Sequence, residues 1–180
     1  MIFMKNEHSN KSENIMRNVV INKMVINVGT GDDKQKQESA KRLLELLTKM
    51  KPVDAISKKR IPAFKISKGS KIGAYVTVRR GVEELLKRLL AATDNKINES
   101  AITDNAVSFG IHEYIDIDGI KYDPKIGMMG MNVNLSFRRK GGMRVSEKKR
   151  RGAYVPKKHR VIGKEELKKY LQEKLNINVV

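Results

Sequence analysis

Four stretches of this chain alternate between apolar and polar residues, the pattern of a β-strand whose two faces meet different surroundings. The pattern is clearest at residues 131–139, where Met131, Val133, Leu135 and Phe137 alternate with Asn132, Asn134, Ser136 and Arg138. The other three stretches are residues 19–28, 72–79 and 106–117. In the last of these, Val107, Phe109, Ile111 and Ile115 are expected to point inward, and Ser108, His112 and Tyr114 outward. The alternation predicts a sheet with one apolar and one polar face.

Two of the intervening segments carry leucines at helical spacing. The first follows Asp32 and Asp33, which are suited to cap a helix, and runs to about Met50, before Pro52 forbids continuation. The second begins at Gly81 and ends near residue 93. A third, shorter helix is expected at residues 164–175. Neither leucine stripe can be buried by its own helix, so both are expected to pack on the apolar face of the sheet.

The predicted fold class is therefore α+β. It has two layers, with a mostly antiparallel sheet, two helices packed on one face and the other face open, followed by a basic C-terminal arm and a short helix. Three segments are expected: a loose leader at 1–17, an α+β domain at 18–140, and the basic arm with the C-terminal helix at 141–180. Residues 53–71 are expected to form a basic loop or irregular hairpin, extended only around residues 64–66.

The open face is predicted to carry amides, hydroxyls and cations. Such groups can donate to phosphates and ribose hydroxyls, although antiparallel sheets often have an ordinary solvated face. The residues expected on this face are Asn27, Tyr75, Thr77, Arg79, Ser108, His112, Asn132, Asn134, Ser136 and Arg138.

The positive charge is segregated along the chain. The net charge is +18. Residues 55–82 hold eight basic residues and no acid, and residues 138–160 hold eleven basic residues and one acid, Glu147. These two segments carry the whole surplus. Solubility alone does not need such segregation, whereas a phosphate backbone releases counterions to clustered lysines and arginines. A polyanionic partner is therefore expected.

The sequence lacks the motifs of several other functional classes. Without cysteine there is no disulfide, thiol chemistry or cysteine-bound zinc. Gly29-Thr30-Gly31 lacks the remainder of a phosphate-binding loop, and the three histidines have no metal-ligand spacing. No catalytic residue, metal or cofactor is expected, so the protein is not expected to be an enzyme. No apolar run is long enough for a membrane span or a signal peptide, and a cytoplasmic location is expected.

Several ordered motifs resemble one known family over about residues 15–140. They are Val25-Ile26-Asn27-Val28-Gly29-Thr30-Gly31, Ala63-Phe64-Lys65-Ile66, Gly69, Ile72-Gly73, Val76-Thr77-Val78-Arg79, Phe109-Gly110-Ile111 with Glu113, and Gly127-Met128-Met129-Gly130-Met131. They are similar to the large-subunit ribosomal protein L-five family, which binds 5S rRNA in the central protuberance. The arginine-rich arm and final helix resemble the archaeal and eukaryotic branch of that family.

The resemblance implies an exposed sheet that grips 5S rRNA, contacts with large-subunit rRNA and neighbouring ribosomal proteins of the central protuberance, and a basic loop near the P-site tRNA. Asn27, Phe64 and Thr77 fall on family positions that touch 5S rRNA. Together with the basic and open-face residues, the expected RNA-binding set is Asn27, Lys58, Lys59, Phe64, Lys65, Thr77, Arg79, Asn132, Asn134 and Arg138. The expected tRNA-proximal loop comprises Lys68, Gly69, Lys71 and Gly73.

The chain departs from the family pattern at three places. Lys49-Met50 stands where Gly-Gln is frequent, Ala55 lies near a position that is commonly Thr, and Lys71 replaces a frequent Pro. The leading hypothesis is a structural component of the large ribosomal subunit in the cytoplasm. The alternatives are a free-standing RNA chaperone or translation regulator using the same surface and, with no motif in its favour, an RNA-modifying enzyme.

Overall fold

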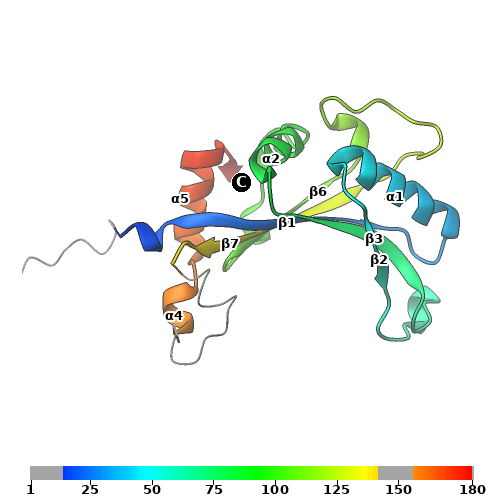
Figure 1. Ribbon diagram of the computed structural model, residues 1–180, viewed down its shortest axis with the longest axis horizontal. Helices are drawn as coiled ribbons and strands as arrows, with labels where there is room; N and C mark the ends of the chain where they lie inside the picture. Colours follow the sequence, from blue (N-terminus) through cyan, green and yellow to red (C-terminus); the bar gives the residue numbers. More distant parts are fainter. Residues whose placement is uncertain (1–13, 142–155, 180) are drawn as a thin grey trace, which may run out of the picture.

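Six strands form the main sheet of the computed structural model, which describes residues 14–141 and 156–179 (Figure 1). The strands lie in the order β2-β3-β1-β7-β6-β5, and every neighbouring pair is antiparallel. Their bounds are β1 Val19–Gly29, β2 Val53–Ile56, β3 Lys71–Val78, β5 Ile102–Thr103, β6 Ala106–Ile111 and β7 Met131–Arg139. A separate parallel pair joins β4 Lys96–Ile97 to β8 Asn178–Val179. The predicted, mostly antiparallel sheet is confirmed.

Three helices cover one face of this sheet. Figure 1 shows α1 (Lys34–Thr48), α2 (Val82–Ala91) and α5 (Lys164–Leu175) on the same side of β1. The remaining helical pieces of the described residues are short: α4 (Lys157–Arg160) and the 3-10 turns η1 Ile15–Arg17, η2 Pro62–Phe64, η3 Glu99–Ala101 and η4 Tyr114–Asp116. The two leucine-striped helices therefore lie on the apolar face, as predicted, and the α+β fold class is confirmed.

The core lies between the helices and the sheet. It combines the strand residues Met24, Ile26, Val28, Val76, Val133 and Leu135 with the helix residues Leu43, Leu44, Leu86, Leu89, Leu90, Leu167 and Leu171, all buried. At the far end, the rings of Phe137 on β7 and Tyr170 on α5 meet edge to face, 5.8 Å apart. The C-terminal helix α5 is therefore part of the same hydrophobic core as the sheet, α1 and α2. The boundary drawn at residue 140 stays a prediction about chain organisation, and residues 1–13 and most of the basic arm lie outside the described residues.

A β-bulge in β1 keeps its apolar residues on the helix side. Ile21 pairs with Phe137 and Lys23 pairs with Ser136, so Asn22 is an extra residue opposite no partner of its own. Before the bulge, Val19 and Ile21 pack against the core; after it, Met24, Ile26 and Val28 do so. The apolar positions change from odd to even numbers at Asn22, and the bulge absorbs that change.

The first helix begins and ends at residues the sequence indicates. Asp33 is the N-cap, and its carboxylate accepts hydrogen bonds from the backbone N–H groups of Gln35 (3.0 Å) and Lys36 (3.3 Å). The helix ends at Thr48, and the C-cap residue Lys49 adopts a left-handed conformation with φ 53°. Pro52 then lies outside the helix.

The predicted strand at 106–117 is too long. Strand β6 ends at Ile111, and η4 follows at Tyr114–Asp116. Because a 3-10 turn does not alternate sides, Tyr114 points inward and is fully buried, whereas Ile115 is exposed. The Tyr114 hydroxyl accepts a hydrogen bond from the backbone N–H of Asp123 at 3.1 Å. The expected directions of these two side chains were therefore wrong.

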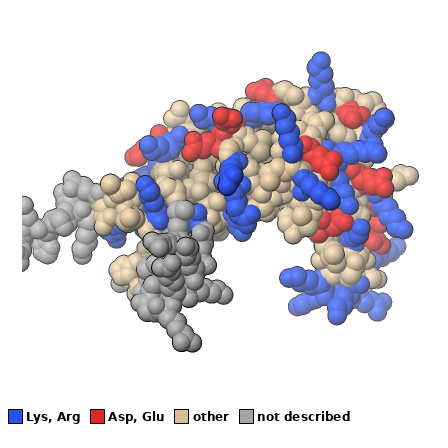
Figure 2. All heavy atoms as spheres, in the orientation of Figure 1, with Lys and Arg blue, Asp and Glu red and all other residues tan. Residues whose placement is uncertain are grey.

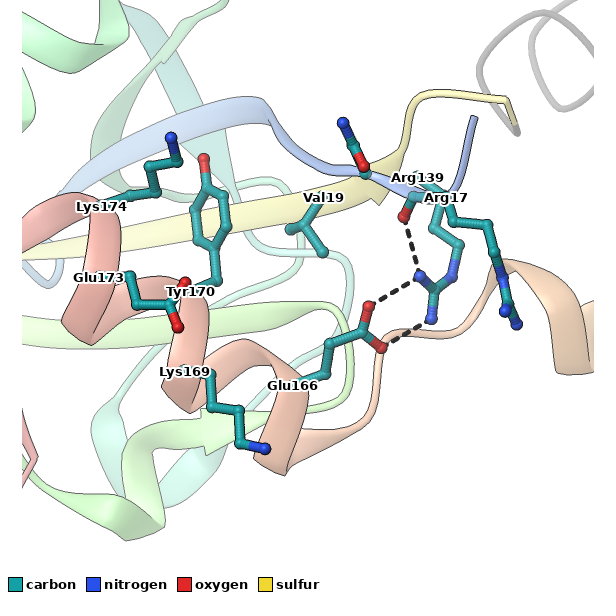
Figure 3. Close-up of a pocket in the computed structure, with 9 residues that line it drawn as sticks. Arg17, Val19, Arg139, Glu166, Lys169, Tyr170, Glu173 and Lys174 are labelled. Atoms are coloured by element: carbon teal, nitrogen blue, oxygen red, sulfur yellow. Dashed lines mark hydrogen bonds and ion pairs between the residues drawn. The ribbon is translucent and has the colours of Figure 1, made fainter. Parts of the chain in front are cut away.

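Arg139 fastens the ends of β1, β7 and α5 together (Figure 3). Its guanidinium donates to both carboxylate oxygens of Glu166, at 2.8 and 2.7 Å, and to the backbone carbonyls of Arg17 (2.9 Å) and Val161 (3.3 Å). Only 13% of the Arg139 side chain is exposed. A bidentate pair of this kind fixes geometry as well as adding energy.

Replacing Glu166 with Ala is expected to lower the free energy of unfolding by about 1–2 kcal/mol, since it leaves the shielded Arg139 guanidinium without its carboxylate. Urea unfolding measures the loss. Glu165→Ala is the matched control: Glu165 also lies in the first turn of α5 but makes no ion pair among the described residues. Equal stability losses for the two variants would contradict the role given to Arg139.

Candidate nucleic-acid interface

The face of the sheet opposite the helices carries polar side chains in rows that cross the strands. Directly paired residues of antiparallel strands point to the same side. One row joins Thr77, Val25, Asn134 and Ser108 across β3, β1, β7 and β6. The next row joins Tyr75, Asn27, Asn132 and Gly110 across the same strands. The register thus brings together Asn27, Thr77, Asn132 and Asn134, four residues that the sequence analysis selected.

These side chains are accessible and uncharged or basic. Asn27, Ser108 and Asn132 are exposed, and Thr77 and Asn134 are half-buried. None of the residues that β1, β3, β6 and β7 place on this face is a carboxylate. Amides and hydroxyls both donate and accept hydrogen bonds, so the face can pair with phosphate oxygens, ribose hydroxyls and base edges without repelling them.

A basic hairpin extends from the edge of this face. Strands β2 and β3 are joined by residues 57–70, and Figure 1 shows this hairpin projecting away from the helices. Figure 2 shows Lys and Arg side chains gathered at its tip. The exposed cations of residues 57–70 are Lys58, Lys59, Arg60, Lys65 and Lys68. We call this segment, with β2 and β3, the basic hairpin.

The tip of the basic hairpin is held by its own backbone. Ile61 and Ile66 exchange two backbone hydrogen bonds, of 2.9 and 3.1 Å. Between them, Pro62 opens η2 and Lys65 adopts a left-handed conformation with φ 55°. Phe64 is consequently directed outward and is 72% exposed. An exposed aromatic ring among five cations is suited to stack on a nucleobase.

The structure corrects three expectations about this segment. Residues 53–56 form a short strand, β2, that was not predicted. Residues 64 and 65 belong to a turn, so that only Ile66 of the expected extended piece is extended, in its bridge to Ile61. Lys71 was assigned to a loop but lies in β3, and Gly73, which the resemblance assigned to the same loop, lies in β3 as the strand predicted at 72–79 requires. The segment around β2 is too short for its alternation to be recognised, and Pro62 with left-handed Lys65 makes a turn of residues that look extended.

Position 73 requires glycine for a steric reason that the assignment of Gly73 to a loop did not predict. It is buried and pairs with Gly29 in β1. A Cβ atom at Gly73 would lie 2.4 Å from the backbone oxygen of Val28. The close approach of β3 to β1 therefore needs glycine at this position. Of the other residues assigned to the loop, Lys68 and Gly69 do lie in it, and both are exposed.

The two remaining sequence-selected residues lie toward the other end of the sheet. Arg79 directly follows β3 and is exposed. Arg138 lies on β7, pairs with Val20 and is half-buried. They extend the polar face away from the basic hairpin.

Asp54 is a member of the site that sequence reasoning missed. Its carboxylate binds Lys41 Nζ at 2.6 Å and Lys71 Nζ at 3.0 Å, and accepts a hydrogen bond from Gln37 Nε2 at 3.2 Å. The hydrogen bond from Lys41, then that from Lys71, lowers the pKa of Asp54 below its usual value. The signal was available, since Asp54 is the single acid between residues 52 and 82.

Metal centres and membrane spans are both absent from the described residues. Within 14–141 and 156–179, no three His, Asp or Glu side chains come together as metal ligands. In the same part of the chain, no helix has the length and apolar character needed to cross a membrane.

Comparison with known proteins gives a consistent result along the chain. A family model described as "Ribosomal protein L5" matches residues 14–66, and a second model, which describes the C-terminus of the same ribosomal family, matches residues 71–168. A protein named large ribosomal subunit protein uL5 from Picrophilus torridus is 41% identical over 171 residues, covering 94% of this chain and 97% of that protein. Proteins with the same name from Sulfurisphaera tokodaii and Nanoarchaeum equitans are 39% and 38% identical, each over 93% of this chain and 95% and 99% of their own lengths.

Proposed function

Because the chain belongs to the ribosomal protein L5 family, we propose that it anchors 5S rRNA in the central protuberance of the large ribosomal subunit without catalysing a reaction. Family membership confirms the resemblance drawn from the sequence, and with it a structural role in the large subunit of the cytoplasmic ribosome. The choice of 5S rRNA as partner is the proposal. No observation favours a free-standing RNA chaperone or translation regulator.

The observation that carries the proposal is the open face, on which two polar rows cross four strands without a carboxylate. Side chains on a sheet are held in register by the backbone ladder, so their donors and acceptors are fixed before RNA arrives. A folded RNA is read largely through its shape, phosphates and 2′-hydroxyls, which such a surface can contact. The amides and hydroxyls set the register, and the lysines and arginines supply affinity.

The basic hairpin is the second part of the proposal. Its loop, residues 57–70, combines five exposed cations with an exposed Phe64. We assign it to contacts with large-subunit rRNA and, through Lys68 and Gly69 near its base, to the neighbourhood of the P-site tRNA. The other proteins of the central protuberance are the remaining proposed partners.

Thr77→Ala and Asn27→Ala are each expected to weaken 5S rRNA binding about twofold to tenfold, the effect of removing one hydrogen bond. Circular dichroism and urea unfolding should be unchanged, because both side chains point away from the core. A binding titration at fixed salt measures the effect. Asn178→Ala, at an exposed amide on β8, is the control and should bind like wild type. Unchanged affinity in both test variants would refute the assignment of this face.

A further inference from the structure

One carboxylate joins the basic hairpin to the first helix. Asp54 lies on β2, Lys71 is the first residue of β3, and Gln37 and Lys41 lie on α1. The Asp54 carboxylate contacts all three of these side chains, at 2.6–3.2 Å. It is 21% exposed, and Gln37 is buried. This cluster connects elements that the backbone ladder does not connect, since α1 shares no strand pairing with the hairpin.

The base of the basic hairpin needs such a connection. Strand β2 is at the edge of the sheet and, among the described strands, pairs only with β3. The pairing is irregular where the hairpin leaves the sheet, because the register shifts between Ala55 and Ile56. A bulge at this point allows residues 57–70, the loop of the hairpin, to bend relative to the sheet. The Asp54 cluster lies next to the bulge and ties both strands of the hairpin, through Asp54 and Lys71, to α1.

We propose that Asp54 is a positioning residue: it fixes the direction of the basic hairpin relative to the open face, so that both surfaces meet one RNA together. This inference rests on the proposed function for its RNA readout. It predicts a change in RNA affinity opposite in direction to the usual effect of removing an acid. Removing an acid beside a polyanion-binding surface ordinarily strengthens binding, whereas replacing Asp54 should weaken it.

The test compares Asp54→Asn with Glu38→Gln. Both variants remove one negative charge and keep the shape of the side chain. Glu38 lines the same cavity of about 390 Å³ as Gln37, Lys41 and Lys71, but makes no ion pair among the described residues. Binding to 5S rRNA is titrated at several salt concentrations. Asp54→Asn is expected to bind about threefold to tenfold more weakly than wild type, and Glu38→Gln as tightly as wild type or slightly more tightly.

The salt dependence separates positioning from general destabilisation. If the hairpin no longer reaches the RNA, Asp54→Asn binds fewer phosphates than wild type. Its plot of log affinity against log salt then becomes shallower by about 0.7–0.9 for each phosphate that it fails to reach. Binding of Asp54→Asn at least as tight as that of Glu38→Gln would overturn the inference. Weaker binding with an unchanged slope would overturn it as well.

Hydrogen exchange tests, without RNA, whether Asp54 holds the base of the basic hairpin. The backbone N–H groups of Ser57 and Gly69 bond across the base of the hairpin, to Ser70 O and Ser57 O, both at 2.9 Å. They should exchange faster in Asp54→Asn than in Glu38→Gln. If wild-type protein fails to bind 5S rRNA, the proposed function is refuted. The exchange of these two amides still tests the positioning role of Asp54, and exchange that is the same in Asp54→Asn and Glu38→Gln would overturn that role.

Discussion

Gly73→Ala is expected to lower the free energy of unfolding by about 2–3 kcal/mol, the cost of forcing atoms into a site with no room. The added Cβ would lie 2.4 Å from the carbonyl oxygen of Val28 and 3.3 Å from the Cα of Gly29. These are backbone atoms of the neighbouring strand, so no side chain can rotate away. β3 must move from β1, which disturbs the ladder that holds Thr77 and Tyr75 in their rows. Urea unfolding followed by circular dichroism measures the loss.

The partner across the ladder supplies the control. Gly29 pairs directly with Gly73, yet a Cβ at Gly29 would meet no atom within 4 Å. Gly29→Ala is therefore expected to change stability by no more than about 0.5 kcal/mol. If the two substitutions cost the same, the tight approach of β3 to β1 is not what requires glycine at residue 73.

The double variant Asn27→Asp/Asn134→Asp is expected to bind 5S rRNA about 100-fold more weakly than wild type, because like charges brought together at an interface cost several kcal/mol. The two positions lie in adjacent rows of the open face, on β1 and β7. Aspartate keeps the shape of asparagine but replaces two donors with a charge that repels phosphate. A binding titration at fixed salt gives the ratio.

The control must carry the same change in net charge elsewhere. Asn98→Asp/Asn178→Asp meets this need, since both residues are exposed and lie at β4–η3 and on β8, outside the main sheet. Its affinity should fall about twofold or less through the weaker overall field. An equal loss in both double variants would mean that net charge, and not the open face, determines binding.

Much of the fold followed from the sequence because the apolar periods are long and unbroken. Residues 131–139 alternate over their whole length and form β7 as predicted. Residues 164–175 form α5 within the predicted bounds. In both cases one face is apolar over several repeats, so local preference and packing agree. The same property predicted the open face, because polar residues on the other side of an alternating strand can only face away from the core.

The remaining features depend on contacts that a single sequence does not show. Tyr114 turns inward because a 3-10 turn interrupts the alternation and the backbone of Asp123 reaches its hydroxyl. The steric need at Gly73 arises from the spacing of two strands more than 40 residues apart in sequence. Asp54 acquires its role from lysines on a helix and on another strand. The predicted RNA-binding residues therefore include the exposed groups of the proposed interface but omit Asp54, the residue proposed to orient the basic hairpin.

Because of the bulge, β1 can lose Asn22 without a change in its pairing, whereas a deletion later in the strand changes it. Deleting Asn22 would remove the unpaired residue and leave every later pairing of β1 in place. Deleting any single residue from 24 to 26 would instead turn Asn27 toward the helices and Val28 toward solvent. Natural length variation in this strand is therefore expected to concentrate at its first third, before the residues of the open face.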